Sequence, residues 1–302
     1  MKSTQKTLVA SSLIAGIVGL STSPLLAQEE DLFTLKAMTG VEYNNNLTVS
    51  DLDLTSGVGD LGFLLDLGGS FSLDTQLGLT VDGGYDYSST RYLDETQFDF
   101  ETHALSGGVA YSLGEFDLGL DAGYYHNRLG GDSFLDLMTL TPSVSTMMGD
   151  TVYLRGQYSY MDKDFKTAAD RSGNSHSFGI SAFVFALDDG YFNVGVELEK
   201  SNTDSNTFDY DGYTLSGGIN VPFLDTEFYA KGKYSGRSYD TALGDDGETR
   251  DDTRSSFSLG LTTDLFVLLT INPEYRMNKV SSNQNSAAFT EHVFKLSVGV
   301  TF

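Results

Sequence analysis

The side chains best suited to catalysis or metal binding are scattered along this chain. The histidines are His103, His126, His176 and His292, and they never fall at the spacing of metal ligands. A zinc site or a Ser–His–Asp arrangement needs several such groups to converge, and the chain has no cysteine to supply a thiolate. The sequence therefore predicts no catalytic residue, no metal site and no cofactor. It favours histidines with a structural or interfacial role.

Carboxylates gather in two polar stretches, and a glycine string stands apart from them. Oxygen-rich loops can hold calcium, but neither stretch has the ligand order of an EF-hand. We expect a solvated acidic surface, with bound divalent cations as the alternative. The string GVGDLG at 57–62 matches a nucleotide-binding pattern, yet a strand-like run follows it where a helix is required. The acidic residues are Asp204, Asp209, Asp211, Asp245, Asp246, Glu248, Asp251 and Asp252.

The composition of the 302 residues narrows the class of protein. The net charge of −24 repels nucleic acid, so no nucleic-acid partner is expected. Hydrophobic residues at 40% and aromatic residues at 12% argue against disorder. The 33 glycines, 20 phenylalanines and 17 tyrosines are typical of many strands joined by tight turns. The mean hydropathy of −0.17 is compatible with strands of which only one face meets lipid.

The first 27 residues have the pattern of a secretory signal peptide. Lys2 and Lys6 precede an apolar run at 7–20, and the polar stretch STSPLLA ends at Ala27, the predicted last residue before cleavage. Loss of the two lysines would take the net charge from −24 to −26. A transmembrane anchor is the alternative, but the run is shorter than the roughly 20 residues that a spanning helix needs.

From residue 33 onward, apolar and polar residues alternate with the period of two that strands have. Phe192, Val194, Val196 and Leu198, for instance, fall on one face of a single strand. The pattern predicts fourteen strands, and bacterial membrane barrels have an even number. The expected strands are 33–44, 57–71, 76–88, 98–112, 116–127, 134–147, 151–161, 174–187, 191–201, 209–222, 226–237, 253–264, 267–279 and 290–302.

Short and long connections alternate between these strands. Outer-membrane barrels have short periplasmic turns and longer extracellular loops, which would place both termini in the periplasm. A soluble β-sandwich is the competing architecture, but its strands need one face for a core, and here the second face is polar on every strand. We therefore predict an all-β, transmembrane, antiparallel up-and-down barrel over residues 28–302. A long connection such as 238–252 could fold inward and close it.

Alternation also predicts which charged side chains point inward. Opposed acidic and basic walls would set up a field across a water-filled lumen, although inward charges could simply solvate it. The predicted lumen charges are Asp66, Asp82, Asp86, Asp117, Asp121, Arg155, Lys231, Lys233, Arg237, Arg276 and Lys295. The last strand resembles the signal read by barrel-insertion machinery, and its residues are Phe294, Leu296, Val298, Val300 and Phe302.

Several stretches of the chain resemble one family, the surface lipoprotein assembly modifiers, in their C-terminal barrel. They include RYLDETQFDF (91–100), HALSGGVAYSL (103–113), NRLGGDSFLD (127–136), YSYMDKDFK (158–166), 174–201, 208–223, 250–261 and the terminal 271–302. The resemblance implies a Gram-negative outer-membrane barrel. Two features depart from the family. About five residues separate Ala27 from the first strand, leaving no room for the helical repeat domain, and Ala287, Ala288 and Phe289 replace a tyrosine pair.

The expected location is the outer membrane, with outer-membrane lipid, lipopolysaccharide and the insertion machinery as partners. The polar inner face predicts a porin-like passive channel for small hydrophilic solutes. The resemblance supports an alternative, a barrel that assists export or surface display of lipoproteins or polysaccharide with a separate periplasmic partner protein. A structural or adhesive surface protein is a third. An enzyme with Ser and His on adjacent strands is the least favoured.

Overall fold

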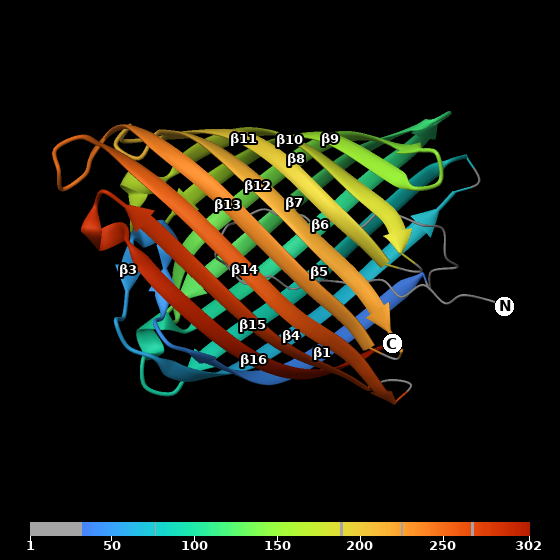
Figure 1. Ribbon diagram of the computed structural model, residues 1–302, viewed down its shortest axis with the longest axis horizontal. Helices are drawn as coiled ribbons and strands as arrows, with labels where there is room; N and C mark the ends of the chain where they lie inside the picture. Colours follow the sequence, from blue (N-terminus) through green and yellow to red (C-terminus); the bar gives the residue numbers. More distant parts are fainter. Residues whose placement is uncertain (1–31, 76, 188–189, 225, 267–268) are drawn as a thin grey trace.

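A computed structural model describes residues 32–302, apart from 76, 188–189, 225 and 267–268. Over this range fourteen antiparallel strands close into one barrel (Figure 1), which confirms the predicted fold class and strand number. Each strand pairs with its neighbour in sequence, and β1 pairs with both β4 and β16. The barrel strands are β1 (Phe33–Asn44), β4 (Asp60–Asp74), β5 (Leu79–Tyr92), β6 (Phe100–Leu113), β7 (Phe116–Leu129), β8 (Asp132–Met148), β9 (Val152–Phe165), β10 (Gly173–Leu187), β11 (Gly190–Thr203), β12 (Tyr210–Phe223), β13 (Thr226–Leu243), β14 (Thr249–Phe266), β15 (Leu269–Ser282) and β16 (Phe289–Thr301).

The two ends of the barrel carry different connections. Tight turns join the strands at the end where β1 begins and β16 ends, and the longer connections lie at the other end. The link between β7 and β8 is an exception at that end, because it is a turn of two residues, Gly130 and Gly131, and not the longer connection expected at 128–133. By the rule for outer-membrane barrels, the long-connection end faces outward. That end holds all the short elements: β2 (Thr48–Val49), η1 (Ser50–Leu52), β3 (Leu54–Thr55), η2 (Thr96–Phe98), η3 (Ala169–Arg171) and η4 (Asn285–Ala287). No helix in the described part of the chain is long and apolar enough to span a membrane.

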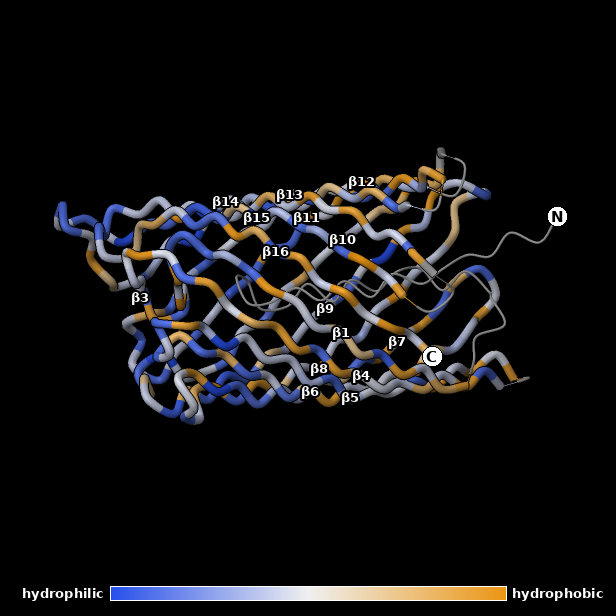
Figure 2. Tube along the Cα trace, turned by 90° about the horizontal axis from the view of Figure 1, so that it is seen from below, coloured by the Kyte–Doolittle hydropathy of each residue, from blue (hydrophilic) through white to orange (hydrophobic). Residues whose placement is uncertain are grey.

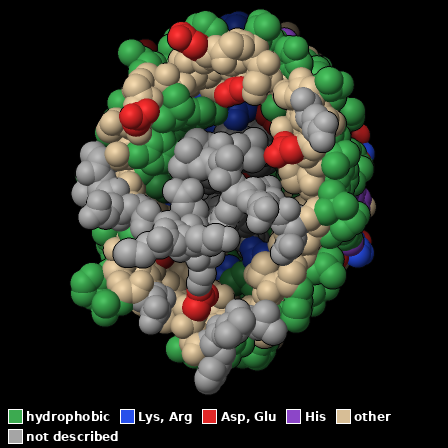
Figure 3. Space-filling model, turned by 90° about the vertical axis from the view of Figure 1, so that its right-hand side faces the viewer, with side chains coloured by type: hydrophobic (Ala, Val, Ile, Leu, Met, Phe, Trp, Pro, Cys, Tyr) green, Lys and Arg blue, Asp and Glu red, His purple; other side chains and the backbone are tan. Residues whose placement is uncertain are grey.

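The outer face of the barrel is apolar along most of its height. Phe63, Val194 and Leu198 are 51%, 59% and 61% exposed, and they alternate with residues that turn inward. Figure 2 shows the orange apolar stretches along the strands and the bluer, more polar long-connection end. Figure 3 shows hydrophobic side chains around the outside of the opposite end, with charged groups visible within the ring. Such exposure is stable only against lipid, because large apolar patches are rare on soluble proteins.

The four histidines lie on this outer face, at the long-connection side, each next to an aromatic or acidic group. Tyr85 Oη lies 2.7 Å from His103 Nδ1, Tyr158 Oη 2.5 Å from His176 Nδ1, and Tyr275 Oη 2.9 Å from His292 Nδ1, while His126 Nδ1 lies 2.6 Å from an Asp136 oxygen. Tyrosines are enriched where a barrel crosses the membrane–water boundary. The histidines therefore belong to an aromatic girdle, in which His103 and His126 are cross-strand neighbours with ring centroids 6.2 Å apart.

The barrel closes between its first and last strands. Lys36 pairs with Thr301 and Asn44 with Val293, and Leu35 and Phe302 exchange backbone hydrogen bonds of 2.9 and 2.8 Å. Closure pairs both edges of each barrel strand. This matters in a membrane because unpaired backbone N–H and C=O groups are costly in lipid. The predicted cleavage site, Ala27, lies outside the described residues and stays a prediction.

Candidate functional site

Two of the predicted lumen charges lie close together on neighbouring strands, and a small residue makes room for them. Asp82 on β5 pairs with Gly108 on β6, which pairs with Asp121 on β7. A Cβ atom on Gly108 would lie 2.8 Å from an Asp82 oxygen and 3.0 Å from an Asp121 oxygen. The two carboxylates therefore share the space above one glycine, and a larger residue there would displace them.

The acidic and basic walls are less separate than the strand order suggested. Acids on β4, β5 and β7 do lie roughly across the ring from Lys231 and Lys233 on β13. Other predicted bases lie among acids: Arg155 Nη2 is 2.9 Å from Asp121, Lys295 Nζ is 3.9 Å from Asp66, and Arg276 Nη2 is 2.6 Å from Glu274. Charges of both signs are therefore interspersed on the inner face, although acids of β5 and β7 lie across the ring from the β13 lysines.

Several charged residues of the inner face were not among the predicted set. The same alternation that turns Asp66 inward also turns Lys36 and Glu42 inward on β1, since Glu42 accepts a 2.6 Å hydrogen bond from Tyr92 on β5. Glu197 on β11 and Glu274 on β15 face the β13 lysines, and Tyr229 donates to Glu274 at 2.6 Å. They could have been found in the sequence by listing the charged residues at the inward-facing positions of every strand.

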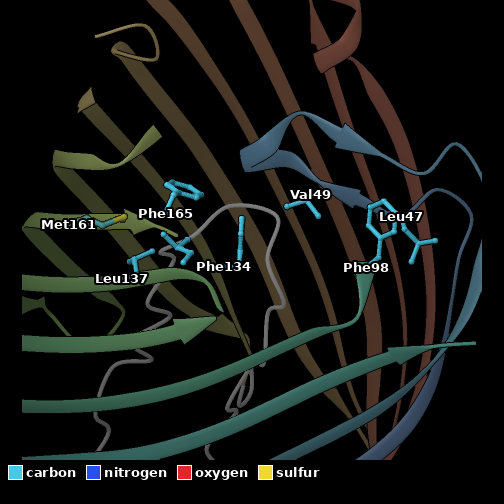
Figure 4. Packing of buried hydrophobic residues seen from close by; sticks show 8 residues of the cluster. Leu47, Val49, Phe98, Phe134, Leu137, Met161 and Phe165 are labelled. Atoms are coloured by element: carbon cyan, nitrogen blue, oxygen red, sulfur yellow. The ribbon is translucent and has the colours of Figure 1, made fainter. Parts of the chain in front are cut away.

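Residues 45–59, here called the mouth segment, reach into the outward end of the barrel. The segment leaves β1, forms the small hairpin β2–β3 through the pair Val49–Leu54, and returns to β4. Its Leu47 and Val49 are 1% and 7% exposed and belong to one buried hydrophobic cluster with residues of η2, β8 and β9 (Figure 4). Those partners are Phe98, Phe134, Leu135, Leu137, Met161 and Phe165.

The expectation that 238–252 folds inward is wrong. β13 continues to Leu243 and β14 starts at Thr249, so that this stretch forms an extended hairpin with Asp246 exposed at its turn. Asp251 and Asp252 are therefore strand residues and not loop residues, because they pair with Ser238 and Arg237 across the hairpin. The polar composition of the stretch suggested a loop, but β13 and β14 pair through it, with an irregularity between Ser238 and Leu243.

Two arginines, Arg250 on β14 and Arg171 in η3, fix the tip of the mouth segment. Arg250 Nη1 and Nη2 donate to both Asp53 oxygens at 2.9 and 2.8 Å, and Arg171 Nη2 donates to Asp53 at 2.8 Å. Arg171 also donates to the Asp51 carbonyl oxygen at 2.7 Å. Asp53 has φ 53°, a left-handed conformation that few non-glycine residues adopt. Although burial opposes its ionisation, the hydrogen bonds from Arg250 and Arg171 hold the pKa of Asp53 below its ordinary value.

The acidic stretches singled out as alternatives for cation binding are engaged with protein donors. Asp246 accepts from the Glu248 amide at 3.1 Å, Asp211 pairs with Lys200 at 3.1 Å, and Asp252 pairs with Arg250 at 2.8 Å. Over residues 32–302 without the gaps, no three His, Asp or Glu side chains group in a way that could hold a metal ion. The charged residues of the mouth segment and of the inner wall are therefore the candidate functional groups.

Comparisons with known proteins bear on this architecture. The family model described as surface lipoprotein assembly modifier matches residues 56–302. An anion-selective porin from Comamonas acidovorans has a TM-score of 0.53 at 10% identity, covering 89% of this chain and 98% of that one. CdiB from Acinetobacter baumannii has a TM-score of 0.51 at 9% identity, covering 91% of this chain and 61% of that one. None of the curated proteins compared with the chain matches it. At such identities the solved structures support the fold alone.

Proposed function

The chain belongs to the surface lipoprotein assembly modifier family and lies in the outer membrane, and we propose that it is a non-enzymatic channel for small hydrophilic solutes. Its mouth segment would narrow the outward opening. The observation that carries the proposal is the inner face, where charged and small polar residues predominate below the apolar cluster of the mouth while large apolar residues face lipid. A face of this kind needs water, since unpaired buried charges are costly.

The strand number supports a narrow passage. Barrels of eight strands are filled by side chains, whereas those of sixteen to eighteen leave an aqueous channel. Fourteen strands lie between these cases, and glycines such as Gly108 reduce the filling of this interior. Lys231 and Lys233 on one wall and Asp82 and Asp86 on the other would orient a polar solute, because a low-dielectric wall focuses the field of its charges.

A second candidate function is supported by the family match, namely a role in placing lipoproteins or polysaccharide at the cell surface. In that role the barrel would act with a separate periplasmic protein. The mouth segment would have to move, since it crosses the outward end and is held on two sides.

Planar bilayer recording of the purified, folded protein tests the channel. We expect discrete conductance steps that are absent from the same preparation after heat denaturation. Absence of conductance from folded protein would reject the channel. Protease accessibility of lipoproteins on intact cells, compared between wild-type and deletion strains, then tests the second candidate, for which we expect loss of surface exposure in the deletion strain.

A further inference from the structure

Arginine side chains at the barrel mouth are stacked on aromatic rings. A guanidinium over a ring is attracted to the ring face and keeps its N–H edge available to acceptors in its own plane. The rings of Tyr210 and Tyr239 lie 5.5 Å apart and form one platform on β12 and β13. The three pairs, with the distance from Cζ to the ring centroid, are Arg171–Phe208 at 3.9 Å, Arg237–Tyr210 at 4.5 Å and Arg250–Tyr239 at 4.6 Å.

Two further cations extend this group along the inner wall. Lys163 on β9 interacts electrostatically with Arg237 and Arg254, and the opposing charges that face it are Glu199 and Asp51. Arg254 on β14 is 16% exposed, lies 3.5 Å from Asp252, and has an Nε atom with no hydrogen-bond partner among the described residues. These two residues, with Arg171, Arg237 and Arg250, are here called the basic cluster, and within it the Arg254 Nε is a donor that the described neighbours do not use.

Half of the compensating carboxylates come from the mouth segment. Glu199 and Asp252 belong to the wall and accept hydrogen bonds from Tyr210 and Arg250. Asp51 and Asp53 belong to the segment, and Asp53 presents both oxygens to Arg250. If the mouth segment moved out of the barrel, only Glu199 and Asp252 of these four carboxylates would remain to neutralise the five cations of the basic cluster. The segment thus supplies a carboxylate where a separate oxyanion would fit.

We propose that the basic cluster is an oxyanion-binding site in which Asp51 and Asp53 act as internal ligands. A small multivalent oxyanion, of the phosphate or polycarboxylate class, competes with them and frees the mouth segment. Arginine forks suit both classes, because two parallel N–H donors match two oxygens of one group. The inference does not depend on the channel function, because binding at the mouth needs no solute to cross the barrel.

Calorimetry with inorganic pyrophosphate on the folded, detergent-solubilised full chain tests the site. A protein whose binding site is mostly occupied by its own segment shows an affinity reduced by the fraction that is open. We expect the Asp51→Asn/Asp53→Asn variant to bind pyrophosphate at least about tenfold more tightly than the wild type. Adding Lys163→Gln and Arg237→Gln to that variant should abolish the gain. Adding Lys200→Gln and Lys279→Gln, which remove the same charge from the outer surface, should leave it intact.

A second readout links binding to release of the segment. Pyrophosphate should increase thermolysin cleavage within residues 45–59 of the wild type, measured by mass spectrometry, with heat-dependent electrophoretic migration confirming a folded barrel. Three results would overturn the proposal. These are no pyrophosphate binding by the folded Asp51→Asn/Asp53→Asn variant, binding that is indifferent to Lys163 and Arg237, and binding to the wild type without increased cleavage. Conductance measurements fail or succeed independently of each.

Discussion

Asp53 and Arg250 are 197 positions apart in the sequence and form a two-point ion pair, at 2.8 and 2.9 Å, across the outward mouth of the barrel. Arg250 is fully buried and Asp252 shares its guanidinium. Removal of one partner of such a pair leaves the other charge buried, which commonly costs about 3–5 kcal/mol. The position of the mouth segment therefore depends strongly on one carboxylate.

Replacing Asp53 with Asn should release the tip of the mouth segment while the barrel stays folded. The isosteric amide is neutral and cannot balance the positive charges of Arg250 and Arg171, so the ion pairs that hold the segment are lost. We expect faster thermolysin cleavage within 45–59 and higher single-channel conductance. Asp246→Asn, at the exposed turn between β13 and β14, is the matched control and should change neither. Unchanged cleavage in Asp53→Asn would show that apolar packing alone holds the segment.

Acid should have the same effect as that substitution. The pKa of Asp53 is lowered in the folded protein, so its contribution to docking is present above the ordinary Asp value of roughly 3.9 and is lost only as the pH falls through the depressed value. The chain lacks cysteine, so a probe on Val58→Cys, an exposed position, can report segment release. We expect a transition below about pH 3.9 in this background. The transition should be missing when Asp53→Asn is added, and its persistence would assign it to another group.

The apolar side of the segment can be tested separately. Leu47 is 1% exposed, whereas Leu54 on the same hairpin is 42% exposed. Truncation of a buried Leu to Ala costs about 2–5 kcal/mol, so Leu47→Ala should raise the cleavage rate of the segment. Leu54→Ala should have little effect. Equal effects of the two substitutions would contradict the packing in Figure 4.

The lumen charges should set ion selectivity if the channel conducts. We expect mild cation selectivity that weakens with added salt, because screening shortens to about 3 Å at 1 M. Asp82→Asn with Asp86→Asn should lower the selectivity, and Lys231→Gln with Lys233→Gln should raise it. Asp150→Asn, in an exposed turn outside the lumen, serves as the control. The measurement is the reversal potential in a salt gradient, and identical potentials in both double variants would refute this assignment.

The last residues of β16 should matter for insertion more than for conduction. Phe302 is 63% exposed and exchanges backbone hydrogen bonds with Leu35 of β1, so we expect its side chain to be accessible to the insertion machinery. Phe302→Asp should reduce the amount of folded protein in the outer membrane, measured by heat-dependent migration of membrane fractions. Phe223→Asp, equally exposed near a turn at the same end, is a comparison that should reduce it less. Normal levels of Phe302→Asp would remove the proposed signal.

Most of the fold was predictable because the alternation of apolar and polar residues along a barrel strand shows which of its faces meets lipid. Alternation in β11, from Phe192 to Leu198, fixes the lipid face without any knowledge of the partner strands. Strand number and pairing follow from that pattern repeated along the chain. The ends of β13 and β14 were misjudged, because a ladder that projects beyond the membrane no longer needs apolar residues and looks like a loop.

The inner wall was predictable in direction, and the mouth was not. Side-chain phase alone turns Asp82 and Lys233 inward. No local pattern indicates that Asp53 meets Arg250 and Arg171, because the contact depends on how far a connection reaches across a closed ring. The same holds for Leu47 against Phe98 (Figure 4). Such contacts are set by tertiary geometry and leave no periodic trace in the sequence.

The pairing of β1 with β16 sets the order in which the molecule can assemble. Every other strand pairing in the ring joins neighbours along the chain, a contact that forms at small loop-closure cost. Lys36 and Thr301, in contrast, meet only after nearly the whole chain has been brought together. The hairpins can therefore form early and independently, whereas ring closure is a late step. Until that step, β1 and β16 both present open edges, and this is the interval in which we expect a protecting partner to matter most.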